Sequence, residues 1–186
     1  MAAGRGWKLK KTVVLVGMMG AGKTAVGKML AADLDVPFLD SDVEIEAAAT
    51  MSVAEIFERD GEAFFRDRET QVIDRLLDTK RGILSVGGGA FLSQRNRDLI
   101  ARKGVSVWLK ADLDLLWSRV KHKNTRPLLR TDDPRATLAD LYEKRLPFYR
   151  MADIAVEARQ DYSIETMAAK VREALLRHQD ELEVEA

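Results

Sequence analysis

The chain has 186 residues, of which 46% are hydrophobic, and its 30 basic residues balance its 30 acidic residues. This length suits one α/β domain with a core between a sheet and its helices, and it leaves little room for a second full domain. The charge balance argues against a long-range field that would draw the protein to nucleic acid or to an anionic membrane.

Cysteine is absent, which excludes disulfides, thiolate metal sites and a cysteine nucleophile and agrees with a cytoplasmic location. The basic N-terminus runs into an apolar stretch that leads straight to a glycine-rich loop, so we expect no cleaved signal peptide. No window reaches the roughly 18 apolar residues of a membrane span. We expect a flexible arm at 1–10, a single domain at 11–179 and an acidic fraying tail at 180–186. A monomer is the default at this size.

Short β-rich runs alternate with helical patterns along the chain. The alternation predicts an α/β fold with a five-stranded parallel sheet covered by helices on both faces. Residues 52–79 are expected to be helical in two pieces, because Ser52 resembles an N-cap and Gly61 interrupts the run. The predicted strands lie near 12–17, 37–39, 82–86, 104–109 and 153–156.

The octapeptide 17–24 matches G-x-x-x-x-G-K-[ST] and follows the first predicted strand. Its glycines let backbone amides approach a polyphosphate closely, Lys23 adds a cation, and the Thr24 hydroxyl can ligate Mg²⁺. A turn needed only for tight packing would not require the Lys-Thr pair. We therefore predict binding of Mg·ATP or Mg·GTP, with the phosphates held by Gly20, Ala21, Gly22, Lys23, Thr24 and Ala25.

Asp40 and Asp42 end the second predicted strand and point the same way, at the sheet edge where ligands bind. One carboxylate can hold water on Mg²⁺ and the other can accept a hydrogen bond or a proton from a substrate hydroxyl. The alternative is that one of them caps the helix that starts near Val43. Gly87, Gly88 and Gly89 follow the third predicted strand and could form a substrate-binding wall, although a turn explains a triple glycine equally well.

Arginines complete the set of candidate residues. Arg66 lies one turn from both Glu62 and Glu69, so it could form a surface ion pair or bind a substrate carboxylate. Residues 120–135 are rich in Lys and Arg and poor in apolar periodicity, which predicts a mobile lid that could deliver Arg126 to the transferred phosphoryl group. Arg145, in the helix after the lid, could return to the substrate pocket.

Taken together, the chain closely resembles the shikimate kinase family over about residues 11–175. The matching motifs are the octapeptide 17–24, Phe38-Leu39-Asp40-Ser41-Asp42, Gly61-Glu62-Ala63-Phe64-Phe65-Arg66, Gly87-Gly88-Gly89, Arg126-Pro127-Leu128 and Arg145-Leu146-Pro147-Phe148-Tyr149. The resemblance implies a P-loop kinase fold, similar to that of nucleoside monophosphate kinases, and phosphorylation of the 3-hydroxyl of shikimate by ATP.

The resemblance also implies roles for individual residues. Asp42, Arg66, Gly88 and Arg145 would bind shikimate, Asp42 through its ring hydroxyls and the two arginines through its carboxylate, in a pocket lined by Phe57 and Phe65. Thr24 and Asp40 match the magnesium positions. Arg126 matches the lid arginine, Arg119 the arginine that covers the adenine, and the loop around Gln160 would lie along the adenine's other side.

Two other functions stay open from the residues alone. A kinase for another small acid such as gluconate, or for a nucleoside monophosphate, would share the lid architecture. A nucleotide-gated binding module would bind ATP without releasing ADP in response to shikimate.

Overall fold

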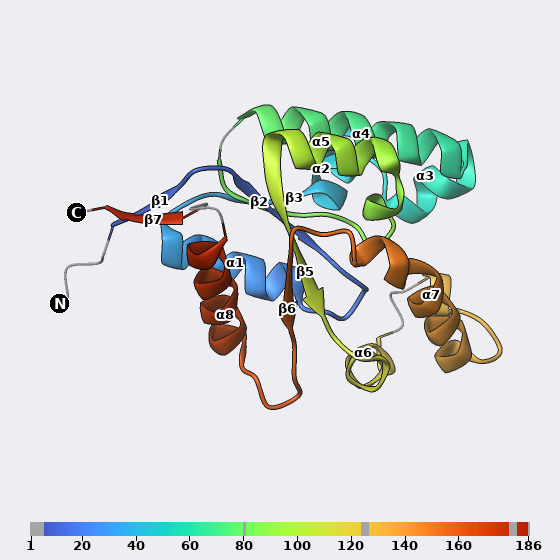
Figure 1. The fold of residues 1–186 in the computed structure, drawn as a ribbon. Coiled ribbons are helices and arrows are strands. Elements are labelled where there is room, and N and C mark those ends of the chain that lie inside the picture. Colours follow the sequence, from blue (N-terminus) through green and yellow to red (C-terminus); the bar gives the residue numbers. More distant parts are fainter. Residues whose placement is uncertain (1–5, 80, 124–126, 179–181, 186) are drawn as a thin grey trace.

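A parallel five-stranded sheet forms the centre of the computed structural model, which describes residues 6–79, 81–123, 127–178 and 182–185 (Figure 1). The strand order is β3-β4-β2-β5-β6, and all neighbouring pairs are parallel. The predicted α/β architecture is confirmed. The strands are β2 (Thr12–Val16), β3 (Phe38–Asp40), β4 (Ile83–Ser85), β5 (Gly104–Lys110) and β6 (Ile154–Glu157).

The central strand β2 consists of five residues that are all buried, and the middle three, Val13 to Leu15, are fully inaccessible to solvent. Such a continuous apolar run is typical of a parallel strand covered on both faces. The chain leaves β2 towards β3 on one side and later enters β5 on the other, so the strand order reverses there. Ligands bind at the carboxyl ends of strands at this kind of switch point.

Helices cover both faces of the sheet. In Figure 1, α1 (Lys23–Leu34) and α8 (Ile164–Arg177) lie side by side below the sheet, whereas α4 (Glu62–Thr79) and α5 (Gln94–Lys103) lie above it. The residues Met167, Ala168, Val171 and Leu175 of α8 are buried against the core. Within the described residues, no helix has both the length and the apolar character that crossing a bilayer requires.

A helical region connects β3 to β4. It contains α2 (Ser41–Ala49) and α3 (Val53–Asp60) ahead of α4. Ser52 caps α3 in a reciprocal capping box with Glu55, and Gly61, with a φ of +87°, separates α3 from α4 as predicted. The three helices enclose a small second core cluster of Ile45, Ile56 and Phe65.

The region between β5 and β6 contains the predicted lid. Helix α6 (Leu113–Val120) precedes it, a short 3-10 turn, η2 (Pro127–Leu129), lies within it, and α7 (Pro134–Tyr149) follows with Asp133 as its N-cap. Residues 124–126 lie outside the described residues. The mobility of the segment stays a prediction.

The two ends of the chain differ from the expectation. Strand β1 (Gly6–Leu9) pairs antiparallel with β7 (Leu182–Glu185), with Leu9 opposite Leu182, and both leucines are buried. The predicted flexible arm and fraying tail are therefore wrong for these residues, because the strands satisfy each other's backbone groups and bury the two leucines. Residues 1–5, 179–181 and 186 lie outside the described residues.

Candidate active site

The loop after β2 has the backbone geometry of a phosphate cradle. Gly17, Gly20 and Gly22 have φ values of +146°, +83° and +93°, a region that side-chain-bearing residues rarely adopt. Helix α1 starts immediately afterwards at Lys23, so the amides of its first turn, which have no acceptor within the helix, point towards the loop. The Lys23 ammonium lies across the loop and donates to the carbonyl oxygens of Gly17 at 2.7 Å and Met18 at 3.0 Å.

A cavity of about 610 Å³ opens from this loop along the carboxyl edge of the sheet. It is lined by residues that are predicted to bind nucleotide, metal and substrate, so the structure brings these groups into one space. The predicted residues in its lining are Gly20, Ala21, Gly22, Lys23, Thr24, Ala25, Asp40, Asp42, Gly87, Gly88 and Arg119.

The two aspartates at the end of β3 have different environments. Asp40 caps α2, because its Oδ1 accepts from the backbone amides of Asp42 at 2.9 Å and Val43 at 3.3 Å. The capping alternative therefore describes Asp40, which nevertheless also lines the cavity. Burial, and then repulsion from Asp40, raises the pKa of Asp42, and the positive charges of Lys23 and Arg66 oppose this shift.

The glycine run 87–89 follows β4, and each glycine faces a different charged side chain. In chain order these are Asp42, Arg145 and Arg66. A Cβ atom at the first glycine would lie 3.0 Å from the Asp42 carboxylate, at the second 2.7 Å from Arg145 Nη1, and at the third it would collide with the Arg66 guanidinium. Because the run lacks side chains, one carboxylate and two guanidinium groups approach its backbone side by side, which an ordinary turn does not require.

Arg66 lies between two carboxylates and two aromatic rings. Its Nη1 is 2.9 Å from Oε1 of Glu69, which is fully buried, and its Nε is 3.6 Å from Oε1 of the exposed Glu62. Its guanidinium carbon lies 5.2 Å from the ring centroid of Phe65 and 6.0 Å from that of Phe57. These contacts fix the guanidinium in one orientation.

Glu69 is more than a surface ion-pair partner. Burial raises the pKa of its carboxyl group, and the charge and hydrogen bond of Arg66 oppose the shift. Its second oxygen, Oε2, has no hydrogen-bond partner among the residues that the structure describes. The spacing of Glu69 from Arg66 predicts an ion pair, but the burial that makes this pair a fixed support depends on tertiary packing.

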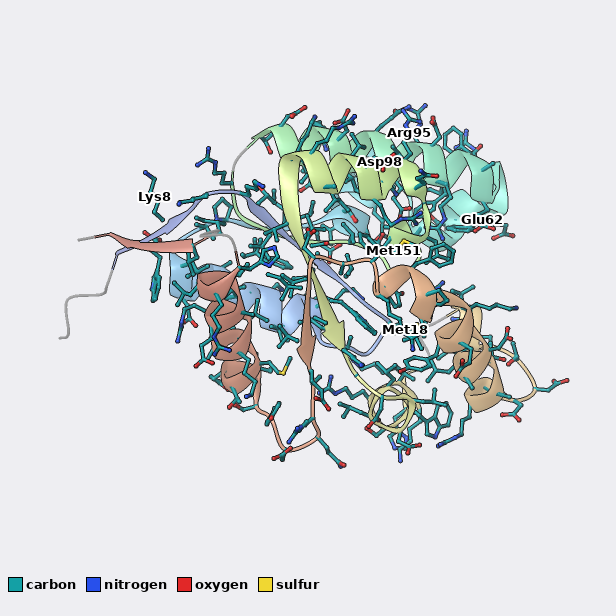
Figure 2. The ribbon with its side chains drawn as sticks, in the orientation of Figure 1. Lys8, Met18, Glu62, Arg95, Asp98 and Met151 are labelled. Carbon is teal, nitrogen blue, oxygen red and sulfur yellow. The ribbon has the colours of Figure 1, made fainter. Side chains whose placement is uncertain are left out.

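Arg145 is buried in α7, four residues before Tyr149. The Tyr149 hydroxyl donates to the carbonyl oxygen of Gly88 and lies 3.9 Å from the sulfur of Met18, a P-loop residue that Figure 2 shows beside α7. Burial raises the pKa of Tyr149 to about 12, against the opposing charge of Arg145. Tyr149 lies in the motif 145–149, but the motif alone indicates no role for it.

At the nucleotide end of the cavity, only some of the predicted residues are found in the lining. Arg119 lines it and donates through Nη1 to the carbonyl oxygen of Gly20 at 3.0 Å. Gln160 is exposed and does not line the cavity, whereas Tyr162, Ser163, Ile164 and Met167 do. The residue pattern around Gln160 gave no signal for this difference, because it depends on where α8 begins. Arg126 lies outside the described residues.

Comparison with known proteins agrees with this geometry. The family model for shikimate kinase matches residues 19–176. The shikimate kinase of Ruegeria pomeroyi is 64% identical over 176 residues, which cover 95% of this chain and 90% of that protein. The chain belongs to the shikimate kinase family. The motif-based resemblance is thereby confirmed.

Other members of the shikimate kinase family extend the match. The shikimate kinase of Cereibacter sphaeroides is 61% identical, with 96% of this chain and 89% of that protein covered. The structure of Acinetobacter baumannii shikimate kinase in complex with shikimate superimposes with a TM-score of 0.86 at 38% identity, covering 91% of this chain and 94% of that chain. Shikimate kinase membership thus accounts for almost the whole chain rather than for the P-loop alone.

Proposed function

We propose that this kinase transfers the γ-phosphoryl group of ATP to the 3-hydroxyl of shikimate, giving shikimate 3-phosphate and ADP. The observation that carries the proposal is the convergence of Asp42, Arg145 and Arg66 on three consecutive glycines beside the P-loop. Two guanidinium groups beside one carboxylate suit an acceptor that carries both an acid group and hydroxyls. Family membership and the shikimate complex of the Acinetobacter relative support the same acceptor.

The acceptor would bind in the half of the site that faces the glycine run. Arg66 and Arg145 would bind the carboxylate of shikimate, and Asp42 would accept hydrogen bonds from its ring hydroxyls. Phe65 is 3% exposed and packs against the half-buried Phe57, with 4.6 Å between ring centroids, so this pair supplies an apolar wall. The amides of residues 20–25 would hold the phosphates of ATP.

The transfer itself needs positioning, charge stabilisation and one proton acceptor. The 3-hydroxyl oxygen would form a bond to the γ-phosphorus while the bond from that phosphorus to the β,γ-bridging oxygen breaks, and ADP leaves. Asp42 would orient the hydroxyl and take its proton, a role that its raised pKa favours over that of an ordinary exposed aspartate. Lys23 and the lid residue Arg126 would stabilise the charge on the transferred group.

The residues present fit a magnesium ion that is bound together with ATP. The described residues contain no group of three or more His, Cys, Asp or Glu side chains placed to hold a metal alone. Thr24, Asp40 and Asp42 nevertheless line one cavity, and Mg²⁺ is typically held by one or two carboxylates plus substrate phosphates. Thr24 would contribute its hydroxyl and Asp40 a carboxylate through water. When bound, the ion neutralises charge on the β- and γ-phosphates.

The remaining assignments complete the proposal. Arg119 would cover one side of the adenine, and the loop around Gln160 the other. The enzyme would act as a monomer in the cytoplasm, where ATP is its phosphoryl donor. Size-exclusion chromatography with light scattering tests the monomer, since a dimer would elute at twice the chain mass.

A coupled assay for ADP release with a panel of acceptors tests the function. We expect rapid release with shikimate and background release with gluconate, with nucleoside monophosphates and without acceptor. Preference for gluconate or a nucleoside monophosphate would identify a different kinase. ATP binding without acceptor-dependent ADP release would identify a binding module.

The Lys23→Ala variant tests the phosphoryl-transfer half of the proposal. We expect turnover to fall at least about 100-fold, because a cation aimed at the transferred group is lost. Lys28→Ala, an exposed lysine on the same helix, is the matched control and should retain wild-type turnover. Near-normal kcat in the Lys23→Ala protein would contradict the scheme.

A further inference from the structure

A buried amide outside the site joins two of the elements that carry the acceptor-binding residues. Asn96, on α5, is fully buried. Its Nδ2 donates to the carbonyl oxygen of Ala90 at 2.9 Å, and its Oδ1 accepts from the hydroxyl of Thr70 at 2.7 Å. The Asn96 side chain thus hydrogen-bonds through its amide nitrogen to one segment and through its amide oxygen to another.

Both segments lead directly to the acceptor site. Ala90 follows the glycine run 87–89 and begins the 3-10 turn η1 (Ala90–Leu92). Thr70 lies one helical turn after Arg66 on α4, and its hydroxyl is also 3.1 Å from the Arg66 carbonyl oxygen. The Asn96 amide therefore bridges the backbone carbonyl that follows the glycines and the Thr70 side chain on the helix that carries Arg66.

The next residue continues the same arrangement. Arg97 donates through Nη1 to the carbonyl oxygens of Phe91 and Leu92, each at 2.8 Å. Its guanidinium carbon lies 5.2 Å from the ring centroid of Phe148, which is on α7 three residues after Arg145. Residues 96 and 97 together thus contact α4, the turn after the glycines and α7.

The glycine run depends on such supports because it has no side chains with which to anchor itself. Its spacing from Arg66 is tight, since a Cβ atom at Gly89 would collide with that guanidinium. A small displacement of α4 relative to the run would change the width of the acceptor site, and binding geometry of this kind is sensitive to shifts well below 1 Å.

We propose that Asn96 and Thr70 form a positioning pair that sets the distance between Arg66 and the glycine run, and thereby the affinity for the acceptor. The inference rests on the proposed function, because it takes Arg66 and the glycines to be the acceptor site. Neither side chain lines the cavity. The pair acts by holding α4 and the 3-10 turn in register.

Thr70→Val tests the pair, because it replaces the hydroxyl with a methyl group of similar size and leaves Asn96 Oδ1 without its donor. We expect the KM for shikimate to rise about tenfold, as for the loss of a buried hydrogen bond, while the KM for ATP stays within about twofold. The kcat at saturating shikimate should fall no more than about threefold. Thr70→Ser keeps the hydroxyl and should restore the wild-type KM.

Asn96→Asp tests the other arm, since it keeps an acceptor for Thr70 but removes the donor to the Ala90 carbonyl. We expect a rise in the shikimate KM of similar size. If the two residues act as one unit, the shikimate KM of the double variant should be no more than about twofold above that of the single variant with the higher KM.

Ser106→Ala is the matched structural control. Ser106, on β5, is also buried and hydrogen-bonds to Asp153, the residue before β6, away from the acceptor elements. This variant should lower the thermal midpoint as Thr70→Val does but leave the shikimate KM unchanged. An unchanged shikimate KM in both Thr70→Val and Asn96→Asp, or equal rises in the KM for shikimate and ATP, would overturn the inference.

The wild-type acceptor panel separates this inference from the proposed function. If the wild-type protein ignored shikimate and used another acceptor, the proposed function would fail, and the same KM comparison with that acceptor would still decide the role of the pair. If Thr70→Val or Asn96→Asp did not fold, the shift in thermal midpoint on adding shikimate would be compared between Thr70→Ser and Thr70→Ala. The inference requires a wild-type shift in Thr70→Ser, which keeps the hydroxyl, and a loss of that shift in Thr70→Ala, which has none. Equal shifts in the two variants would overturn it.

Discussion

Asp42 has conflicting requirements for stability and for chemistry. Binding a hydroxyl and accepting its proton need the ionised carboxylate, whereas burial and the neighbouring Asp40 favour the protonated form and raise its pKa. A carboxyl group whose pKa is raised by folding contributes stability below its unfolded pKa and loses that contribution as the pH rises through the folded value. At neutral pH the folded protein therefore bears a cost for keeping Asp42 charged.

Replacing Asp42 with Asn should separate these effects. We expect the Asp42→Asn variant to lose at least about 100-fold in kcat, because the proton acceptor is gone. Its free energy of unfolding should rise by about 1 kcal/mol at pH 7, and the gain should shrink as the pH falls through the raised pKa. Steady-state kinetics and thermal unfolding between pH 4 and 8 measure both quantities.

Asp140→Asn makes the same chemical change at an exposed position on α7 and serves as the control. It should change neither kcat nor the pH dependence of unfolding. A stability gain in the Asp42→Asn protein that grows towards acid pH would contradict the assigned sign.

Tyr149 gives a second prediction at the scale of one residue. The Tyr149→Phe variant leaves the Gly88 carbonyl oxygen without its donor, which should lower the free energy of unfolding by about 1–3 kcal/mol and raise the shikimate KM. Because folding raises the pKa of Tyr149 to about 12, the advantage of wild type should be constant up to about pH 10. It should then decline towards pH 12.

Unfolding by denaturant between pH 7 and 11 measures the advantage. Tyr142→Phe, a half-buried position on the same helix, is the control and should leave the shikimate KM unchanged. A Tyr149→Phe protein with wild-type stability and wild-type KM would show that the hydroxyl does not support the glycine run.

At the scale of elements, the P-loop packs against the end of α6. A Cβ atom at Gly20 would lie 2.8 Å from Cγ1 of Val120, the last residue of α6, and Arg119 donates to the Gly20 carbonyl. The predicted lid begins at the same point. The nucleotide loop and the base of the lid are therefore in direct contact.

Gly20→Ala should disturb this contact and weaken ATP binding at least about tenfold, because the backbone φ of +83° and the close approach of Val120 both oppose a side chain. Gly61→Ala is a suitable control. Its φ of +87° is similar, but among the described residues, its two chain neighbours aside, no heavy atom lies within 4 Å of a Cβ atom built there. It should lower stability and leave ATP affinity unchanged, as measured by calorimetric titration. Equal losses of ATP affinity in both variants would assign the effect to global stability.

The elements that sequence predicted well are those with a local signal. The central strands are continuous apolar runs, the P-loop carries its own motif, and Asp42 and Gly88 follow strands whose carboxyl ends meet at one edge. Contacts that depend on how helices pack had no such signal. The Asn96 bridge to Thr70 joins residues 26 positions apart and has no motif.

The same limit explains the two ends of the molecule. Strands β1 and β7 are four residues each, and their pairing joins the first described residues with the last. In the sequence, so short a segment of mixed polar and apolar residues resembles a frayed tail, because pairing with a partner strand rather than local propensity decides its structure. In the whole molecule this pairing places β1 and β7 beside α1 and α8 (Figure 1).

The pairing of β1 with β7 should contribute to the stability of the molecule and have little effect on catalysis. Leu182 of β7 is 3% exposed and belongs to the main core, so Leu182→Ala should lower the free energy of unfolding by about 2 kcal/mol and the thermal midpoint by roughly 4–8 °C. Helix α8 leads from the nucleotide cavity to β7, with Met167 in the cavity lining and Leu175 in the core. Since Met167 is held by the core independently of β7, the KM for ATP should stay within about twofold.

The same substitution at Leu176, which is 36% exposed on α8, provides the comparison for Leu182→Ala. Leu176→Ala should shift the midpoint by no more than about 2 °C, because little apolar area is lost. Differential scanning calorimetry at one protein concentration measures both variants. Equal midpoints for Leu182→Ala and wild type would mean that β7 contributes nothing to the fold, whereas a large rise in the ATP KM would mean that the terminal strands hold α8 in place over the nucleotide.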